Sequence, residues 1–131
     1  MTLEDLSANR VDVYAAPSIE YRGSRVFETA PPSQGFVVLE ELKILESLDL
    51  AGLPAGSEQE IHLMVEAKKL AVADRNAYAG DPRFVDFDVE RLLSAEHGAK
   101  LAGTIDRSVS RGTAPVPVAD GDTTYLCVVD R

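Results

Sequence analysis

Two amphipathic segments in the middle of the chain predict a pair of packed helices. From Phe36 to Leu48, apolar residues recur at helical spacing and charged residues fill the positions between them. We expect the apolar side to face a core and the charged side to face solvent. The apolar set is Phe36, Val38, Leu39, Leu42 and Leu45, and the charged set is Glu40, Glu41, Lys43 and Glu46.

The second helix is predicted to follow a break that contains Gly52, Pro54 and Gly56. Ser57-Glu58-Gln59-Glu60 has the spacing of a capping box, in which a serine hydroxyl and an acid three residues later satisfy free backbone amides. The helical pattern continues to Tyr78, and its expected apolar face consists of Ile61, Met64, Val65, Leu70, Ala71 and Ala77. Because alanines permit close packing, the two helices are predicted to form an αα-hairpin.

Shorter elements precede this pair. Thr2 and Asp5 have capping-box spacing, which predicts a short helix near the start of the chain. From Ser18 to Thr29, apolar and polar residues alternate on both sides of Arg22-Gly23-Ser24. This alternation around a glycine turn predicts a β-hairpin.

The C-terminal part combines short helices, a linker and a strand. Arg83 to Phe87 are predicted to be extended, and one or two helices are expected between Val89 and Ala102. Serine, arginine, glycine, threonine, proline and aspartate dominate from Asp106 to Gly121, which predicts an exposed linker. Thr123 to Asp130 then predict a strand, in which Cys127 is expected to be a buried structural thiol. Because the sequence ends inside this strand, we expect a truncated chain.

Composition and charge narrow the possible functions. With 131 residues, of which 45% are hydrophobic and 27% charged, the chain has the size and balance of one folded domain. Its net charge of −9 disfavours binding to nucleic acid. The sequence shows no apolar run long enough to span a membrane and no signal peptide. This favours the cytoplasm, while a periplasmic or secreted location of a longer parent protein stays open.

Few side chains have the spacing of a metal or nucleophile site. His62 and His97 fall on different predicted helices without a second ligand nearby in sequence, so polar-face or capping roles are expected. Asp120-Gly121-Asp122 lacks the remaining ligands of a calcium loop. Pairing Cys127 with His97 as nucleophile and base has no positional support. We expect no metal and no cofactor.

Other charged residues are given structural roles. Asp74-Arg75, near the end of the second long helix, is expected to form an ion pair that fixes the turn at Gly80-Asp81-Pro82. The acidic faces of both long helices are expected to be solvated surface.

Six short blocks occur in a specific order along the chain. They are Tyr21-Arg22-Gly23; Pro31-Pro32-Ser33-Gln34-Gly35; Leu42 with Ile44-Leu45-Glu46; Glu66-Ala67-Lys68 with Ala73-Asp74-Arg75; Gly80-Asp81-Pro82; and Asp122-Thr123-Thr124-Tyr125 with Val128-Val129-Asp130. Any one of them occurs by chance in many proteins. In this order and spacing they resemble the γ-glutamyltransferase family, and the resemblance covers nearly the whole chain.

This resemblance implies an N-terminal-nucleophile hydrolase of α+β class, of which the chain would form a helix-rich part of an αββα sandwich. Such proteins are proenzymes that cut their own backbone before a threonine, and the matching bond here is Asp122-Thr123. Thr123 would then be the catalytic nucleophile, with its freed amine as base. Residues 1–122 would be the end of the large subunit, with 106–122 as the tail before the cut, and 123–131 the first strand of the small subunit.

The resemblance also implies that the catalytic machinery is incomplete. The arginine that grips the substrate carboxylate is expected upstream of this sequence. The acid that holds the substrate amine and the serine and glycine groups of the oxyanion hole are expected downstream of Arg131. We therefore expect the chain alone to be inactive, with the rest of the same enzyme as its partner and a small-molecule amide as substrate. Apolar surface left uncovered would favour self-association.

Two alternatives stay open. Ser33-Gln34-Gly35-Phe36 and Tyr125-Leu126-Cys127 look closer to the branch that includes oxamate amidohydrolases and acylases than to the glutathione-cleaving branch, which leaves the acyl group undecided. The other alternative is a non-catalytic helical interaction module or the remnant of a degraded gene. It predicts that the isolated chain folds cooperatively.

Overall fold

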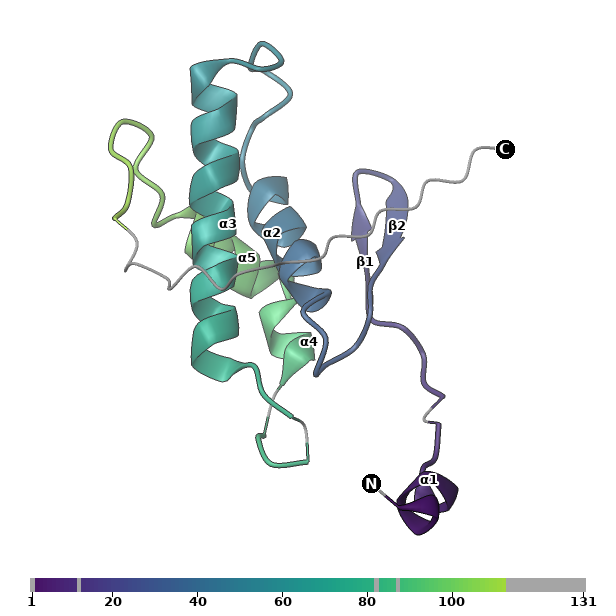
Figure 1. Ribbon diagram of the computed structural model, residues 1–131. Helices are drawn as coiled ribbons and strands as arrows, with labels where there is room; N and C mark the ends of the chain where they lie inside the picture. Colours follow the sequence, from purple (N-terminus) through teal and green to yellow (C-terminus); the bar gives the residue numbers. More distant parts are fainter. Residues whose placement is uncertain (1, 12, 82, 87, 113–131) are drawn as a thin grey trace.

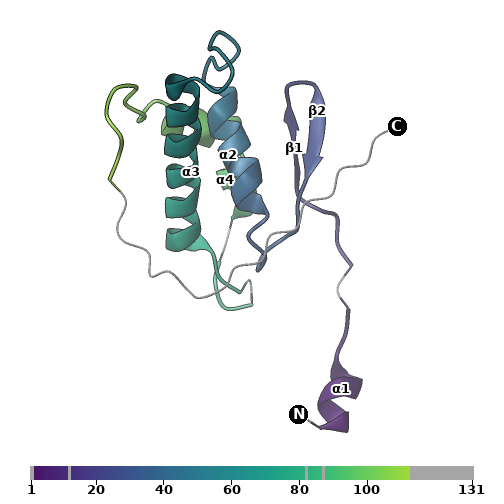
Figure 2. The same cartoon turned by 45° about the horizontal axis from the view of Figure 1, so that its top comes forward.

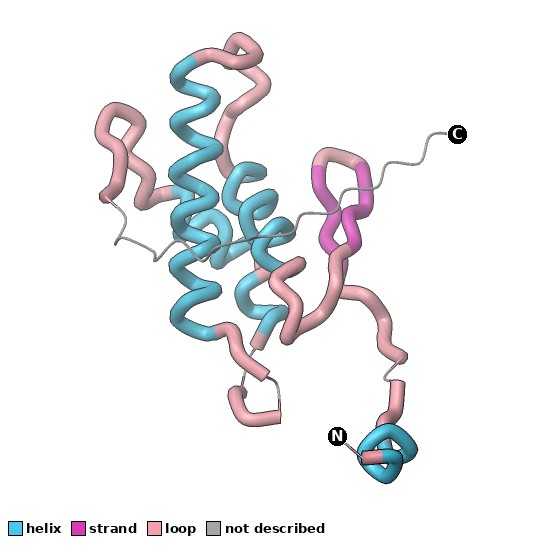
Figure 3. The backbone as a smooth tube through the Cα atoms, viewed as in Figure 1, coloured by secondary structure: helices cyan, strands magenta, loops and turns pink. Residues whose placement is uncertain are grey.

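The computed structural model describes residues 2–11, 13–81, 83–86 and 88–112. Three helices form its centre: α2 (Phe36–Glu46), α3 (Glu58–Tyr78) and α5 (Ala95–Ala102), with the single turn α4 (Val89–Leu92) leading into α5 (Figure 1). A two-stranded hairpin, β1 (Ser18–Tyr21) and β2 (Ser24–Phe27), lies beside α2, and α1 (Leu3–Ala8) lies apart from the centre (Figure 3). This helix-rich α+β arrangement matches the predicted class.

The predicted αα-hairpin is confirmed, because α2 and α3 run side by side in opposite directions (Figure 2). Ser57 caps α3 by accepting a hydrogen bond from the Glu60 amide. The Glu60 carboxylate accepts from the Gly56 amide and not from that of Ser57, so only half of the predicted capping box forms. The core between α2, α3, α4 and α5 consists of buried apolar side chains, namely Phe36, Val37, Ile44, Leu45, Leu50, Leu63, Ala67, Leu70, Ala71, Leu92 and Ala102. Among the described residues, none of the helices combines the length and apolar character needed to cross a bilayer.

The prediction of which residues of the two long helices face the core is partly wrong. Val38 on α2 and Ile61, Met64 and Val65 on α3 are exposed, whereas the acids Glu40 and Glu66 are buried. On α2 the reason is that α3 and α5 both pack against it, so its buried sector includes Val37, Glu40 and Ile44 and leaves Val38 outside. On α3, Leu70 and Ala71 are buried as predicted, whereas in the first half of the helix the buried positions are Leu63, Glu66 and Ala67 in place of Ile61, Met64 and Val65.

The shorter elements fit the sequence pattern better. Thr2 and Asp5 form the predicted reciprocal capping box of α1. In the hairpin, Arg22 and Gly23 have φ values of 49° and 84°, which is the left-handed pair that a tight two-residue hairpin turn requires. The hairpin is fixed to α2 by Lys43, whose Nζ donates to the Glu20 carbonyl at 3.0 Å.

The stretch after α3 differs from the prediction. Residues 83–86 are not extended: the amides of Phe84 and Val85 both donate to the Asp81 carbonyl, which closes a turn. Phe87 lies outside the described residues. One or two helices were expected between Val89 and Ala102, and two are present, α4 and α5.

The helices α2 and α5 approach each other closely at Gly98. A Cβ atom at this position would lie 2.7 Å from the Lys43 carbonyl oxygen and 2.9 Å from the Lys43 carbonyl carbon. Because both atoms belong to the backbone of α2, neither can turn aside as a flexible side chain would. Glycine at this position is therefore a packing requirement.

Candidate functional site

The predicted cleavage bond Asp122-Thr123, Cys127 and the predicted strand all lie outside the described residues. Their roles stay predictions. The described chain does include residues 106–112, the first part of the predicted tail, and shows how this segment is held before the chain continues toward Asp122.

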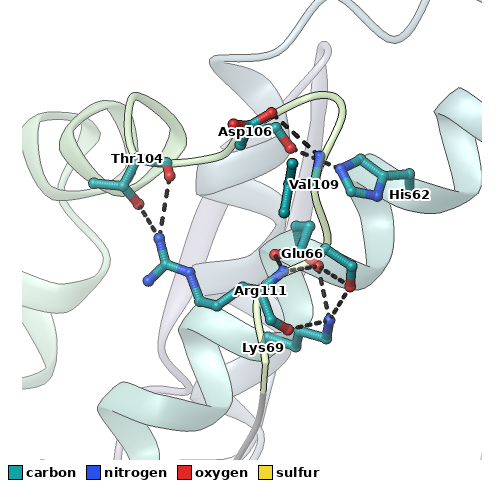
Figure 4. Close-up of polar contacts among 8 residues, drawn as sticks. His62, Glu66, Lys69, Thr104, Asp106, Val109 and Arg111 are labelled. Atoms are coloured by element: carbon teal, nitrogen blue, oxygen red, sulfur yellow. Dashed lines mark hydrogen bonds and ion pairs between the residues drawn. The ribbon is translucent and has the colours of Figure 1, made fainter.

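Residues 106–112 have no helix or strand and are exposed, as the sequence predicts. Their path is nevertheless defined by hydrogen bonds. The Asp106 carboxylate accepts from the amides of Ser108 and Val109 at 2.8 and 3.2 Å, which tightens a local turn. The Asp106 carbonyl lies 2.8 Å from Nε2 of His62 on α3, so this turn is tied to the long helix (Figure 4).

A second contact ties the end of the segment to α3. The carboxylate of Glu66 accepts hydrogen bonds from Lys69 Nζ at 2.7 Å, from Ser110 Oγ at 3.0 Å and from the Arg111 amide at 3.1 Å (Figure 4). Lys69 Nζ also donates to Ser110 Oγ and to the Arg111 carbonyl, each at 2.7 Å. We call Glu66, Lys69, Ser110 and Arg111 the tail anchor.

The tail anchor also reaches the end of α5. The guanidinium of Arg111 donates to the carbonyl and the hydroxyl of Thr104, each at 3.1 Å. Glu66 is 2% exposed, so its carboxylate relies on these protein donors in place of water. The acidic faces of both long helices were expected to be solvated, so this contact was not predicted. Its partners Ser110 and Arg111 lie 44 and 45 residues away from Glu66.

The tail anchor stabilises the ionised form of Glu66. Burial acts to raise its pKa, but the hydrogen bonds from Lys69, Ser110 and Arg111 and the charge of Lys69 outweigh burial and hold the pKa below the ordinary value of 4.5. Because the folded-state pKa is lowered, the contribution of this carboxylate is fully present above pH 4.5 and is lost as the pH falls through the folded-state value.

Replacing Glu66 with glutamine should loosen the tail without unfolding the helices. The amide keeps the shape of the side chain but places an NH2 group among the donors of Lys69 and Arg111, so part of the network is lost. We expect trypsin to cleave after Arg107 and Arg111 about tenfold faster, as followed by mass spectrometry. Glu58→Gln, at an exposed position on the first turn of the same helix, is the control and should leave the rate unchanged. Equal rates for both variants would contradict the role of the anchor.

A second cluster lies where α2, α3 and α5 meet. Nε2 of His97 lies 2.6 Å from Asp74 Oδ2 and 3.3 Å from Glu40 Oε1. This corrects two expectations: His97 has carboxyl partners and does more than cap or line a polar face, and Asp74 pairs with His97 and not with Arg75. Arg75 instead donates to the Gln34 side chain at 2.6 Å, so it links α3 to the turn before α2.

Glu40 is the most unusual member of this cluster. It is fully buried, and burial together with the neighbouring Asp74 carboxyl raises its pKa to about 9, against a smaller opposing effect of Arg91. A carboxyl group with this pKa is neutral at pH 7 when nothing else balances its charge. Ligand atoms of Glu40, Asp74 and His97 all lie within 4.8 Å of one another, so these residues form a possible metal site. Spacing along the sequence gave no sign of it, because each residue comes from a different helix.

The chain matches the family model described as gamma-glutamyltranspeptidase over residues 1–131. It is 38% identical to the glutathione hydrolase-like YwrD proenzyme of Bacillus subtilis, over 99% of this chain and 24% of that protein. It is 37% identical to the oxamate amidohydrolase proenzyme of Klebsiella pneumoniae, over 100% of this chain and 24% of that protein. The chain thus spans about a quarter of the length of these curated relatives.

The fold agrees with a solved structure of the same family. The chain superposes on the gamma-glutamyltranspeptidase of Helicobacter pylori with a TM-score of 0.78 and 32% identity, over 82% of this chain and 31% of that one. The family model, the relatives and the fold therefore lead to the same assignment: this chain belongs to the gamma-glutamyltranspeptidase family.

Proposed function

We propose that this chain is part of an amidohydrolase proenzyme that cuts its own backbone at Asp122-Thr123 and then uses Thr123 as its catalytic nucleophile. The observation that carries the proposal is the family match over residues 1–131, which includes the block Asp122-Thr123-Thr124-Tyr125. The relatives named above are proenzymes, which supports a maturation step.

The chemistry needs only groups at the bond itself and water. The Thr123 hydroxyl attacks the carbonyl carbon of Asp122, the peptide C–N bond breaks, and the chain is held by an ester between Asp122 and the Thr123 oxygen. The proton of the hydroxyl passes to the leaving nitrogen, so the Thr123 α-amine is free once the C–N bond has broken. Water then opens the ester, which frees the Asp122 carboxylate and restores the Thr123 hydroxyl. An α-amine has an ordinary pKa of about 8, so it can take the proton of the adjacent hydroxyl during later turnover.

The tail anchor suggests what residues 106–112 do during this cleavage. Cleavage before Thr123 would leave a new carboxyl end at Asp122, and the anchor would keep the segment leading to it bound to α3 through Glu66 and Lys69. We infer that only the residues after the anchor move away from the new amine. In this proposal, the residues after the anchor move away from Thr123, while the anchored residues keep the large subunit folded.

The proposed reaction class is amide cleavage through an acyl-threonine, by hydrolysis or by transfer. The two relatives named above, a glutathione hydrolase-like protein and an oxamate amidohydrolase, have nearly equal identity to this chain, so both a γ-glutamyl amide and a smaller amide fit. By resemblance, we expect the substrate clamps and the oxyanion hole to lie outside this chain. We therefore propose that the chain alone is inactive and that its partner is the remainder of the same enzyme.

Mass spectrometry of the full-length protein tests this proposal. After folding at neutral pH, we expect two polypeptides, with the smaller one beginning at Thr123. Incubation with an amide substrate and a rapid acid quench should then add the mass of the acyl group to the smaller polypeptide alone. A single intact chain with no acylated Thr123 would refute the proposal.

A further inference from the structure

Glu40, Asp74 and His97 contain two carboxyl groups and one group that can carry a positive charge, and the nearby charge of Arg91 offsets only part of the cost of burying Glu40. Glu40 is fully buried, and neither of its carboxyl oxygens has a hydrogen-bond partner among the described residues. His97 can supply one positive charge, whereas two carboxyl groups lie near its ring. An unpaired buried carboxylate is costly, so the cluster needs either a proton or a cation.

The ligand atoms of the three side chains all lie within 4.8 Å of one another. The distance between His97 Nε2 and Glu40 Oε1 is 3.3 Å. Two ligands of one zinc ion, each about 2.1 Å from the metal, lie roughly 3.0–3.4 Å apart, so this pair already has the required separation. Asp74 Oδ2, at 2.6 Å from the same nitrogen, would have to move away by about half an ångström. The side chains of His97 and Asp74 are 14% and 18% exposed, which leaves an edge through which an ion can enter.

We propose that Glu40, Asp74 and His97 bind a divalent transition metal ion, with zinc as the best match. One imidazole and two carboxylates suit zinc, whereas calcium and magnesium prefer oxygen ligands alone. Because the ligands come from α2, α3 and α5, a bound ion would join the three central helices. This site is independent of the reaction proposed for Thr123.

Isothermal titration calorimetry of the chelator-treated 131-residue chain with zinc tests the site. We expect one saturable equivalent, together with a rise in the temperature of thermal unfolding. Glu40→Gln, Asp74→Asn and His97→Gln preserve side-chain shape, and each should weaken binding about a hundredfold or more, since even residues that only support metal ligands account for 10–100-fold. His62→Gln removes the half-buried histidine of α3, which lies outside this cluster, and should leave the affinity unchanged.

Nuclear magnetic resonance gives a second readout that needs no variant. The chain contains two histidines, so zinc added to the wild-type chain should shift the imidazole nitrogen signals of His97 and not those of His62. The absence of saturable zinc binding would overturn the proposal and leave a proton as the balancing charge. Binding that is lost in His62→Gln and kept in His97→Gln would overturn it as well.

Discussion

Replacing Thr123 with alanine in the full-length protein is expected to leave one uncut chain with no measurable amidase activity. The variant loses the hydroxyl that attacks the Asp122 carbonyl, so the backbone cannot shift to an ester and no new α-amine forms. It also loses the oxygen that would carry the acyl group. Removing a catalytic nucleophile typically lowers the rate on the order of 10⁴-fold or more, and here the free amine is lost with it.

Two matched variants separate this role from a general effect on folding. Thr123→Ser keeps a hydroxyl at the same position and should still be cut, although more slowly. Thr124→Ala changes the neighbouring threonine and should give two polypeptides. Electrophoresis and amide turnover follow both properties in the same samples. Full turnover by Thr123→Ala would show that another residue is the nucleophile.

The sequence predicted the elements of this fold better than their faces. Caps and turns depend on local chemistry, so the capping box of Thr2 with Asp5, the cap formed by Ser57, and the turn at Arg22-Gly23 were predicted where they occur. Which side of a helix is buried depends on how many neighbours it has. That information is not local, and Val38 and Glu40 were therefore assigned to the wrong sides of α2.

The two buried acids, Glu40 and Glu66, have the same spacing to buried apolar neighbours, although their charge led us to expect them on the surface. Glu40 has Val37 three residues before it and Ile44 four residues after it, and Glu66 has Leu63 and Leu70 at the same offsets; all four apolar residues are buried. Each acid therefore occupies a core position of its helix. A carboxyl group at such a position needs a distant partner, which Glu66 finds in Ser110 and Arg111. For Glu40, the proposed partner is a metal ion.

For the candidate site, the sequence predicted only what the family resemblance implies. The blocks around Asp74, Gly80 and Thr123 led to the family, which the comparisons confirm, while the cleavage bond stays a prediction. Neither the tail anchor nor the cluster at His97 was predicted. Both join residues that are far apart in sequence, and only the packing of α3 against α5 and against the 106–112 segment brings them together.

Replacing Gly98 with alanine tests that packing most sharply. A glycine-to-alanine change within a helix usually stabilises the protein, whereas here we expect it to destabilise the protein. In an unconstrained helix, glycine to alanine stabilises by up to about 1 kcal/mol. At Gly98 the new methyl group would meet the Lys43 carbonyl oxygen at 2.7 Å, so α2 and α5 must separate. We expect Gly98→Ala to lower the free energy of unfolding by about 1–3 kcal/mol.

Urea unfolding followed by circular dichroism measures this change, and the C-cap of the same helix provides the control. A Cβ atom at Gly103 would lie 3.5 Å from its nearest neighbours, the carbonyl oxygens of Ala99 and Lys100, and the backbone there has a φ of −63°. Gly103→Ala should therefore be nearly neutral. If Gly98→Ala were as stable as the control, α5 could not lie as close to α2 as described, and the meeting of His97 with Glu40 and Asp74, which depends on the same contact, would lose its support.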